Sequence, residues 1–419
     1  MRHTGRALAV VMCLAVAAAA PVAASAEGFD STVAPRIVRA QEVHEGPVAL
    51  PGAAKTLVVT YESTSVAGHP TPMTGSLLLP STPPPPGGWP LVVWSHMTTG
   101  AADRCAPSTA SYGDPELARM TSGDAIVTGL LDSGFAVARP DYEGIGGPGT
   151  HPYLIGSSLA RSVVDIARAA QTYYPDIGTD VILAGHSEGA VASLWAAALP
   201  VEEWGGLSLR GVAALAPPTQ MGTIVTQASR IPWAGPGIGD LVGLAALMIN
   251  GASAVDEDFH TLTTEGGLFF RDATATAEID TLCYGELASA QSIGALAPSE
   301  LLGPRGEEAL GRLAAITDAN DVAHLSIDTH IPVRIDAAQF DAVAPLPVVV
   351  GLAESYRRAG NEVTFAHHPG GHTDVATRPG VAAQIVDWTR LAFDRHRPLP
   401  SPAPTTARES QNSSYVSGS

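Results

Sequence analysis

Short apolar runs alternate with longer segments of helical periodicity along most of the chain, and this alternation restricts the fold more than any other feature. Continuous apolar runs are typical of strands that are buried on both faces. Strands that alternate with helices after an initial pair of strands favour a mainly parallel α/β sheet flanked by helices. The predicted strands cover 57–61, 76–79, 91–94, 135–138, 181–184, 211–215, 331–335 and 363–366, and the predicted helices cover 158–174, 190–198, 348–358 and 381–393.

One region, from about 217 to 330, interrupts the alternation. It holds no clear strand, and its helical patterns are broken by Gly and Pro. Within it, 237–249 is mostly apolar and 298–316 is amphipathic. We therefore predict a helical cap inserted between two strands of one sheet. The alternative is that these helices belong to the core of a larger fold, since apolar helices are more often core than ligand pocket.

The first 26 residues have the pattern of a secretory signal peptide, with a basic start, an apolar run over 7–20 and a small-residue triplet at 24–26. The run is shorter than the roughly 20 residues that span a bilayer, and no later stretch is expected to be long and apolar enough. We expect a secreted, extracellular protein without a stable membrane anchor. The folded domain should cover 27–396, followed by a disordered tail at 397–419 that is rich in Pro, Ser and Thr.

The balance of charged residues is strongly acidic, with 23 Lys and Arg against 41 Asp and Glu and a formal net charge of −18. Such a surface repels phosphate backbones and anionic membranes, so we expect no nucleic-acid partner. The Cys and His residues form no cluster with the spacing of metal ligands, so we expect no metal site.

Two cysteines, Cys105 and Cys283, remain once the signal peptide is removed. Disulfides persist in oxidising compartments, and the predicted export would place the chain in one. A single Cys105–Cys283 disulfide is the favoured interpretation, and two buried free thiols are the alternative.

The segment Gly185-His186-Ser187-Glu188-Gly189 lies between the predicted strand 181–184 and the predicted helix 190–198. A G-x-S-x-G sequence in this context indicates a sharp turn that holds a nucleophilic serine. Side chains two residues either side of the serine would not fit in such a turn. The turn should expose the Ser187 hydroxyl and aim the backbone N–H of Glu188 toward the same point.

A serine nucleophile needs a base to take its proton and an acid to orient that base. After a turn of this kind the order along the chain is Ser, acid, His. Asp341 follows the predicted strand 331–335 at a turn and is the predicted acid. Asp336 is the alternative, but it continues the strand itself.

The predicted base is His372, which stands in a loop after the predicted strand 363–366 and before the last helix. Two glycines precede it and would let the loop carry the ring over the sheet edge. His367 and His368 are close by, but they end the strand and lack this approach.

Hydrolysis by such a site also needs N–H groups that stabilise the developing oxyanion. The segment 95–100 follows the predicted strand 91–94. We predict that its backbone, through Thr98, supplies one donor and that Glu188 supplies the other.

Taken together, these motifs resemble those of the secretory lipase family of α/β-hydrolases, which includes fungal lipase A enzymes and bacterial secreted members. The resemblance extends over nearly the whole mature chain and rests on 96–100, 105–108, 140–144, 151–153, 185–189, 283–286, Asp341 and His372. The chain differs from the family at Met97 and Ala338, where the family usually has glycine. The resemblance implies the α/β-hydrolase fold, a Ser187–Asp341–His372 triad, a helical cap over an acyl tunnel, and a disulfide matching Cys105 and Cys283.

The resemblance further implies hydrolysis of triacylglycerols and simpler esters without a cofactor, with a lipid or small ester as substrate and a lipid–water interface as the place of action. Two alternatives remain open. A secreted serine peptidase could use the same triad, because fold does not fix function, but it should have a charged pocket for a peptide terminus. A non-catalytic binding protein could use a hydrolase scaffold, but it would usually have lost a triad member.

Overall fold

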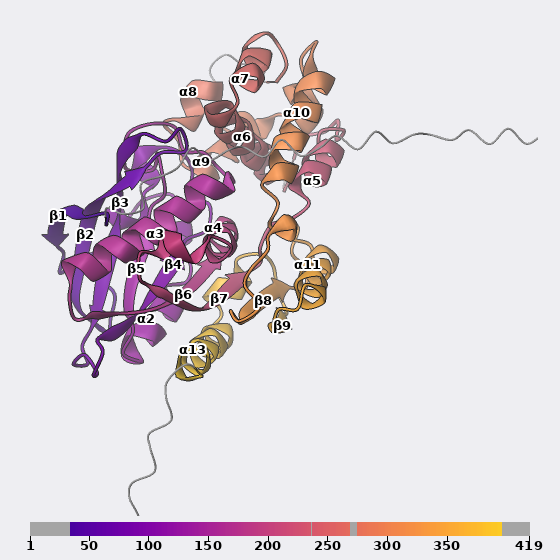
Figure 1. Cartoon of the computed structure of the whole chain (residues 1–419). Coiled ribbons are helices and arrows are strands. Elements are labelled where there is room, and N and C mark those ends of the chain that lie inside the picture. The colour runs from indigo at the N-terminus through magenta and orange to yellow at the C-terminus, as the bar shows by residue number, and fades with distance from the viewer. Residues whose placement is uncertain (1–33, 236, 269–274, 396–419) are drawn as a thin grey trace, which may run out of the picture. The chain divides into compact units, whose positions relative to one another are not determined.

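The computed structural model describes residues 34–235, 237–268 and 275–395 (Figure 1). The predicted signal peptide and the predicted C-terminal tail lie outside the described residues. The described strands form a nine-stranded sheet in the order β1-β2-β3-β5-β4-β6-β7-β8-β9. They are β1 (Ile37–Glu42), β2 (Ala53–Thr64), β3 (Pro70–Pro80), β4 (Trp89–Ser95), β5 (Ala136–Pro140), β6 (Ile177–His186), β7 (Ser208–Leu215), β8 (Val333–Ala338) and β9 (Val363–His368).

The sheet is antiparallel at one edge and parallel elsewhere. β1, β2, β3 and β5 pair antiparallel in that order, and β5, β4, β6, β7, β8 and β9 pair parallel. Every residue of β4 and β5 is buried, as expected for parallel strands with both faces covered. The predicted α/β-hydrolase fold class is confirmed, with one further edge strand, β1, that was not predicted.

Two pairs of helices cover the parallel strands. α2 (Asp124–Asp132) packs against α13 (Pro379–Asp394), and α3 (Gly156–Tyr173) packs against α4 (Glu188–Ala197). The remaining helices of this part are α1 (Leu117–Met120), α11 (Leu346–Arg358) and α12 (Asp374–Thr377). Because the parallel strands end at one edge, the loops after β4, β6, β8 and β9 meet there, and β4 has β5 on one side and β6 on the other. A change of direction of this kind opens a crevice at the carboxyl ends of the strands.

Between β7 and β8 the described residues form helices and no strand of the sheet. These helices are α5 (Met221–Ala228), α6 (Ile238–Val255), α7 (Glu257–Thr264), α8 (Ala275–Ile279), α9 (Tyr284–Leu287) and α10 (Gly306–Ala319), and Figure 1 shows them gathered in one group. The amphipathic stretch predicted over 298–316 is not one helix. A short 3₁₀ turn ends at Leu301 and α10 begins only at Gly306, because Gly303 and Pro304 interrupt the helical hydrogen bonding.

α6 corrects the expectation that no later stretch is apolar enough to span a membrane. Its 18 residues have a mean hydropathy of 1.6, which meets the length and composition of a span. However, 56% of this window is buried inside the protein. Leu244 and Met248 of α6 are buried and line a pocket, so part of the apolar surface of this helix faces the interior of the protein.

The Cys105–Cys283 disulfide is present, with the two Cα atoms 5.5 Å apart. It joins the loop after β4 to the residue that precedes α9. Next to it, the Tyr284 N–H donates a hydrogen bond of 2.9 Å to the Thr99 carbonyl. The disulfide and this bond therefore tie the helical insert to the loop that carries Thr98.

Asp165 gives a testable dependence of stability on pH. It lies buried on α3, where it accepts a hydrogen bond of 2.8 Å from the Ser63 hydroxyl, and burial raises its pKa to about 6. A carboxyl whose folded pKa is raised loses stability as pH rises from its unfolded pKa, near 4, through its folded pKa. We expect ionisation of Asp165 to cost the wild type about 3 kcal/mol of unfolding free energy between pH 4 and pH 7. Asp165→Asn should escape this loss.

Urea unfolding of both proteins at pH 4 and pH 7 measures this change in unfolding free energy, because the contributions of other titratable groups cancel when the two proteins are compared. Asp387→Asn is the matched control, since the Asp387 side chain is 72% exposed. If the unfolding free energies of wild type and Asp165→Asn changed equally across this pH range, the raised pKa of Asp165 would be contradicted.

Candidate active site

Ser187 stands at the turn between β6 and α4 in a backbone conformation that few non-glycine residues adopt. Its φ is 58° and its ψ is −119°, which is strained for a residue with a side chain. The flanking glycines make this turn feasible. A Cβ on Gly185 would lie 2.1 Å from the Gly189 carbonyl oxygen, and a Cβ on Gly189 would lie 2.0 Å from the Ser95 carbonyl oxygen.

Three side chains that are far apart in the sequence form a continuous hydrogen-bonded chain at the carboxyl edge of the sheet. His372 Nε2 lies 2.7 Å from the Ser187 Oγ. His372 Nδ1 lies 2.8 Å from Asp341 Oδ2. Ser187 follows β6, Asp341 follows β8 and His372 follows β9. This is the geometry in which a carboxylate orients an imidazole to take a proton from a serine.

Asp341 is held as a carboxylate by its surroundings. Burial alone raises its pKa, but the hydrogen bond and charge of His372 and two backbone N–H groups together hold the pKa below the usual value. The N–H groups of Val343 and Ala344 both donate to Oδ1 at 2.8 Å. The acid is therefore ionised and fixed in position before His372 gains a proton.

The alternative acid, Asp336, has other partners. It accepts two hydrogen bonds from the Arg334 guanidinium, at 2.6 and 2.8 Å, and its Oδ1 lies 2.7 Å from His368 Nε2. His367 is exposed on β9. The structure thus brings Asp341 and His372 to Ser187 and places Asp336 and His368 in a separate buried cluster.

The two predicted oxyanion donors stand in segments that follow adjacent strands of the sheet. Glu188 is the first residue of α4, so its N–H is one of those that a helix leaves without an intrahelical acceptor. Thr98 is buried in the loop after β4, and its hydroxyl lies 2.9 Å from the Tyr153 hydroxyl. β4 and β6 are parallel neighbours, so both predicted donors stand at the carboxyl edge of the sheet.

His186 also contributes to this site and was not predicted. Its Nε2 lies 2.9 Å from the His372 carbonyl oxygen, and since a carbonyl only accepts, Nε2 carries the hydrogen. Burial lowers the pKa of His186 to about 3, with a smaller contribution from His372. A neutral His186 therefore ties the loop of His372 to the nucleophile strand. Its place beside Ser187 in the motif was visible in the sequence, but its contact with residue 372 was not.

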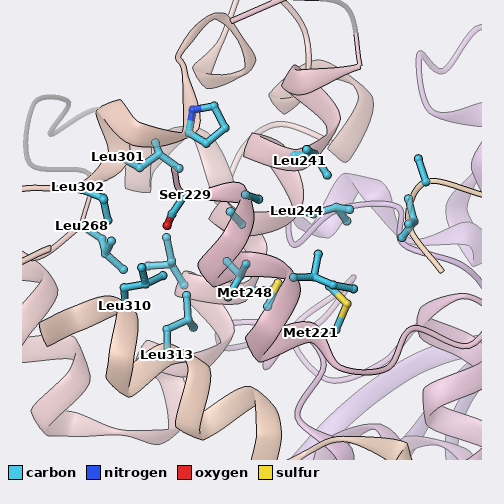
Figure 2. A pocket seen from close by; sticks show the side chains of 18 residues that line it. Met221, Ser229, Leu241, Leu244, Met248, Leu268, Leu301, Leu302, Leu310 and Leu313 are labelled. Carbon is cyan, nitrogen blue, oxygen red and sulfur yellow. The ribbon is translucent and has the colours of Figure 1, made fainter. Parts of the chain in front are cut away.

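An apolar pocket, with about 660 Å³ of space that protein atoms do not fill and that is partly open to solvent, lies among the helices of the insert (Figure 2). Among the described residues of its lining, Ser229 alone has a polar side chain. Ala342 and Val343, which directly follow Asp341, form part of its wall, so the pocket reaches the turn that holds the acid. The other lining residues are Met221, Ile224, Val225, Ala228, Leu241, Leu244, Ala245, Met248, Ile249, Leu268, Pro298, Leu301, Leu302, Leu310 and Leu313.

Across the described part of the chain, no three His, Cys, Asp or Glu side chains group as metal ligands do.

Comparison with known proteins places this geometry in a family. The sequence model of the family described as secretory lipase matches residues 118–395, which is more than half of the chain. A Mycobacterium tuberculosis protein named a probable inactive lipase is 23% identical over 387 residues, covering 87% of this chain and 80% of its own length. Lipase 7 of Candida albicans is 35% identical over 96 residues, or 22% of each chain.

Solved structures share the fold. Candida antarctica lipase A in its closed state is 17% identical with a TM-score of 0.70, covering 87% of this chain and 83% of that chain. The rice cell wall degrading esterase LipA of Xanthomonas oryzae is 18% identical with a TM-score of 0.64, covering 86% and 99%.

Proposed function

Because the chain belongs to the secretory lipase family, we propose that it is a secreted hydrolase that cleaves carboxylic esters of lipids through an acyl-enzyme on Ser187. The observation that carries this proposal is the hydrogen-bonded chain from Ser187 through His372 to Asp341, at 2.7 and 2.8 Å. The cleavable signal peptide expected at 1–26 and the Cys105–Cys283 disulfide support export to an oxidising compartment.

The geometry supports the following sequence of steps. His372 Nε2 takes the proton of the Ser187 hydroxyl as Oγ attacks the ester carbonyl, and the backbone N–H groups of Glu188 and Thr98 stabilise the oxyanion. Asp341 stabilises the imidazolium that forms. His372 then gives its proton to the departing alcohol and leaves the acyl group on Ser187. A water molecule, deprotonated by His372, attacks the acyl carbonyl, and His372 then returns the proton to Ser187 Oγ as the bond to the acyl group breaks and the acid product leaves.

The apolar pocket supports an acyl chain as the group bound beside the triad. Its described lining is apolar apart from the Ser229 hydroxyl and contains no charged side chain. A peptidase that recognises a peptide terminus would need such a charge. We therefore propose that the helices over 217–330 act as a cap, in which the pocket holds the acyl chain of a triacylglycerol or simpler ester.

Esters with acyl groups from butyrate to palmitate test this function. We expect the wild type to hydrolyse long-chain esters, including those presented above their solubility limit. Ala245→Phe should lower kcat/KM for palmitate more than about tenfold and affect butyrate much less, because Ala245 lines the pocket on α6. Ala254→Phe is the control, since Ala254 is exposed at the end of the same helix.

Equal losses of kcat/KM for butyrate and palmitate esters in Ala245→Phe would contradict the proposal that the pocket binds the acyl chain. Hydrolysis confined to short soluble esters in the wild type would make the protein an esterase and not a lipase. Absence of ester hydrolysis altogether would favour a peptidase or a binding protein on this scaffold.

A further inference from the structure

A buried histidine and a buried glutamate pair directly behind the nucleophile turn. His151 lies in the loop between β5 and α3, and its Nε2 is 2.8 Å from Glu188 Oε1. Neither side chain has any exposed surface. An ionised carboxylate in such a position is costly unless a partner compensates its charge.

The hydrogen bonds of His151 determine the net charge of the pair. Its Nδ1 lies 2.8 Å from the Glu143 carbonyl oxygen, and since a carbonyl only accepts, Nδ1 carries a hydrogen. The contact with Glu188 then needs one further proton, held either by Nε2 or by the carboxyl group. In both cases the pair has a net charge of zero.

Among the described residues, the one positive charge that acts on the neighbours of this pair is Arg119, which influences Tyr153 but forms its ion pairs with Glu116 and Asp240. Burial raises the pKa values of Tyr142 and Tyr153, and burial lowers the pKa of His96, so all three are neutral near pH 7. Burial also raises the pKa of Glu143, which is itself an acid.

The geometry of Glu188 leaves it dependent on His151. Its second oxygen, Oε2, is buried and has no hydrogen-bond partner among the described residues. The rings of Tyr142 and Tyr153 lie 6.1 and 6.0 Å from the His151 ring and help to exclude water. Among the described residues, His151 is therefore the hydrogen-bonded partner that can compensate a charge on Glu188.

The position of Glu188 links this pair to the proposed reaction. Glu188 follows Ser187, and its N–H is a proposed oxyanion donor. A negative charge in a low-dielectric region beside the oxyanion would raise the barrier to its formation. Resting on the proposed function, we propose that His151 is a positioning residue that neutralises the Glu188 side chain, so that the start of α4 presents a donor without an opposing negative charge.

The same cluster extends to the second donor. The Tyr153 ring packs edge to face on His151, and its hydroxyl bonds the hydroxyl of Thr98. His151 thus also supports, through Tyr153, the loop that carries the Thr98 N–H.

The test compares His151→Gln with the double variant His151→Gln/Glu188→Gln. The single variant keeps an uncompensated carboxyl, which ionises as pH rises. We expect its kcat for a soluble short-chain ester to decline on the alkaline side, to about 100-fold below wild type at pH 8, with KM changed less than about threefold. The double variant has no carboxyl to ionise, so it should keep the wild-type shape of the pH profile and recover kcat at least about tenfold at pH 8.

His368→Gln is the matched control. It breaks another buried histidine–carboxylate contact, of 2.7 Å, but Asp336 keeps its bonds to Arg334. It should leave the shape of the pH profile unchanged. All assays run below the thermal unfolding midpoint of each variant, so that loss of folded protein does not enter kcat.

Equal impairment of the single and double variants at every pH, or the same alkaline decline in His368→Gln, would overturn the proposal in favour of a structural role. If His151→Gln does not fold, a folded and active double variant still supports it, whereas a double variant that also fails to fold overturns it. Labelling with a fluorophosphonate, which reacts with an activated serine, distinguishes failure of the proposed function from failure of the proposed role of His151. A wild type without ester hydrolysis or labelling at Ser187 refutes the proposed function itself, whereas an active wild type confines any failure to the role of His151.

Discussion

Ser187→Ala is expected to lower kcat for ester hydrolysis about a million-fold while leaving the fold intact. Removing the nucleophile of a serine triad costs about this much, because the remaining groups cannot form the acyl-enzyme. The hydroxyl contributes little to folding, since its hydrogen bond goes to His372 at the edge of the site. Steady-state kinetics, circular dichroism and the thermal unfolding midpoint, measured on the same preparation, check both halves of this expectation.

Ser193→Ala is the matched control for that variant. Ser193 is also a buried serine and lies on α4, but its hydroxyl has no hydrogen-bond partner among the described residues. It should keep kcat within a few-fold of wild type. Undiminished hydrolysis in Ser187→Ala would place the nucleophile elsewhere.

The sequence was most informative where structure follows from local pattern. Continuous apolar runs identified the central strands, such as β4 and the 181–184 part of β6, because strands covered on both faces bury consecutive apolar residues. β1 was missed because it is an edge strand whose residues are mostly exposed, so it carries no apolar run. The interruption at Gly303 and Pro304 was visible in the sequence, but the amphipathic pattern on both sides of it concealed the break.

The candidate site likewise contains residues that the sequence could predict and residues that it could not. The turn at Ser187 could be predicted because the G-x-S-x-G motif lies within five consecutive residues, although the contact that excludes a side chain at 189 is with Ser95 on a neighbouring strand. The contact of His186 with the His372 carbonyl joins residues 186 positions apart, and periodicity has no means of pairing them. The His151–Glu188 pair was hidden for a similar reason, because an acidic residue at the start of a helix is usually a solvated favourable charge and only packing shows that this one is buried.

Asp341→Asn is expected to lower kcat about 10,000-fold with little loss of stability. An amide in place of the carboxylate leaves the geometry intact but stabilises the wrong tautomer of His372 and cannot stabilise the imidazolium. Its oxygen can still accept from the N–H groups of Val343 and Ala344, which hold the turn in wild type.

Asp336→Asn should show the opposite division between activity and stability, which makes it the matched control for Asp341→Asn. It removes a buried charge from Arg334 and His368, and breaking such a pair costs about 3 to 5 kcal/mol of unfolding free energy. kcat per folded molecule should change little, because Asp336 does not contact His372. Urea unfolding and kcat for both variants decide between the two acids. A large loss of kcat in Asp336→Asn together with an active Asp341→Asn would assign the orienting role to Asp336. The hydrogen bond between Asp341 and His372 would then be a contact of the resting protein that the reaction does not use.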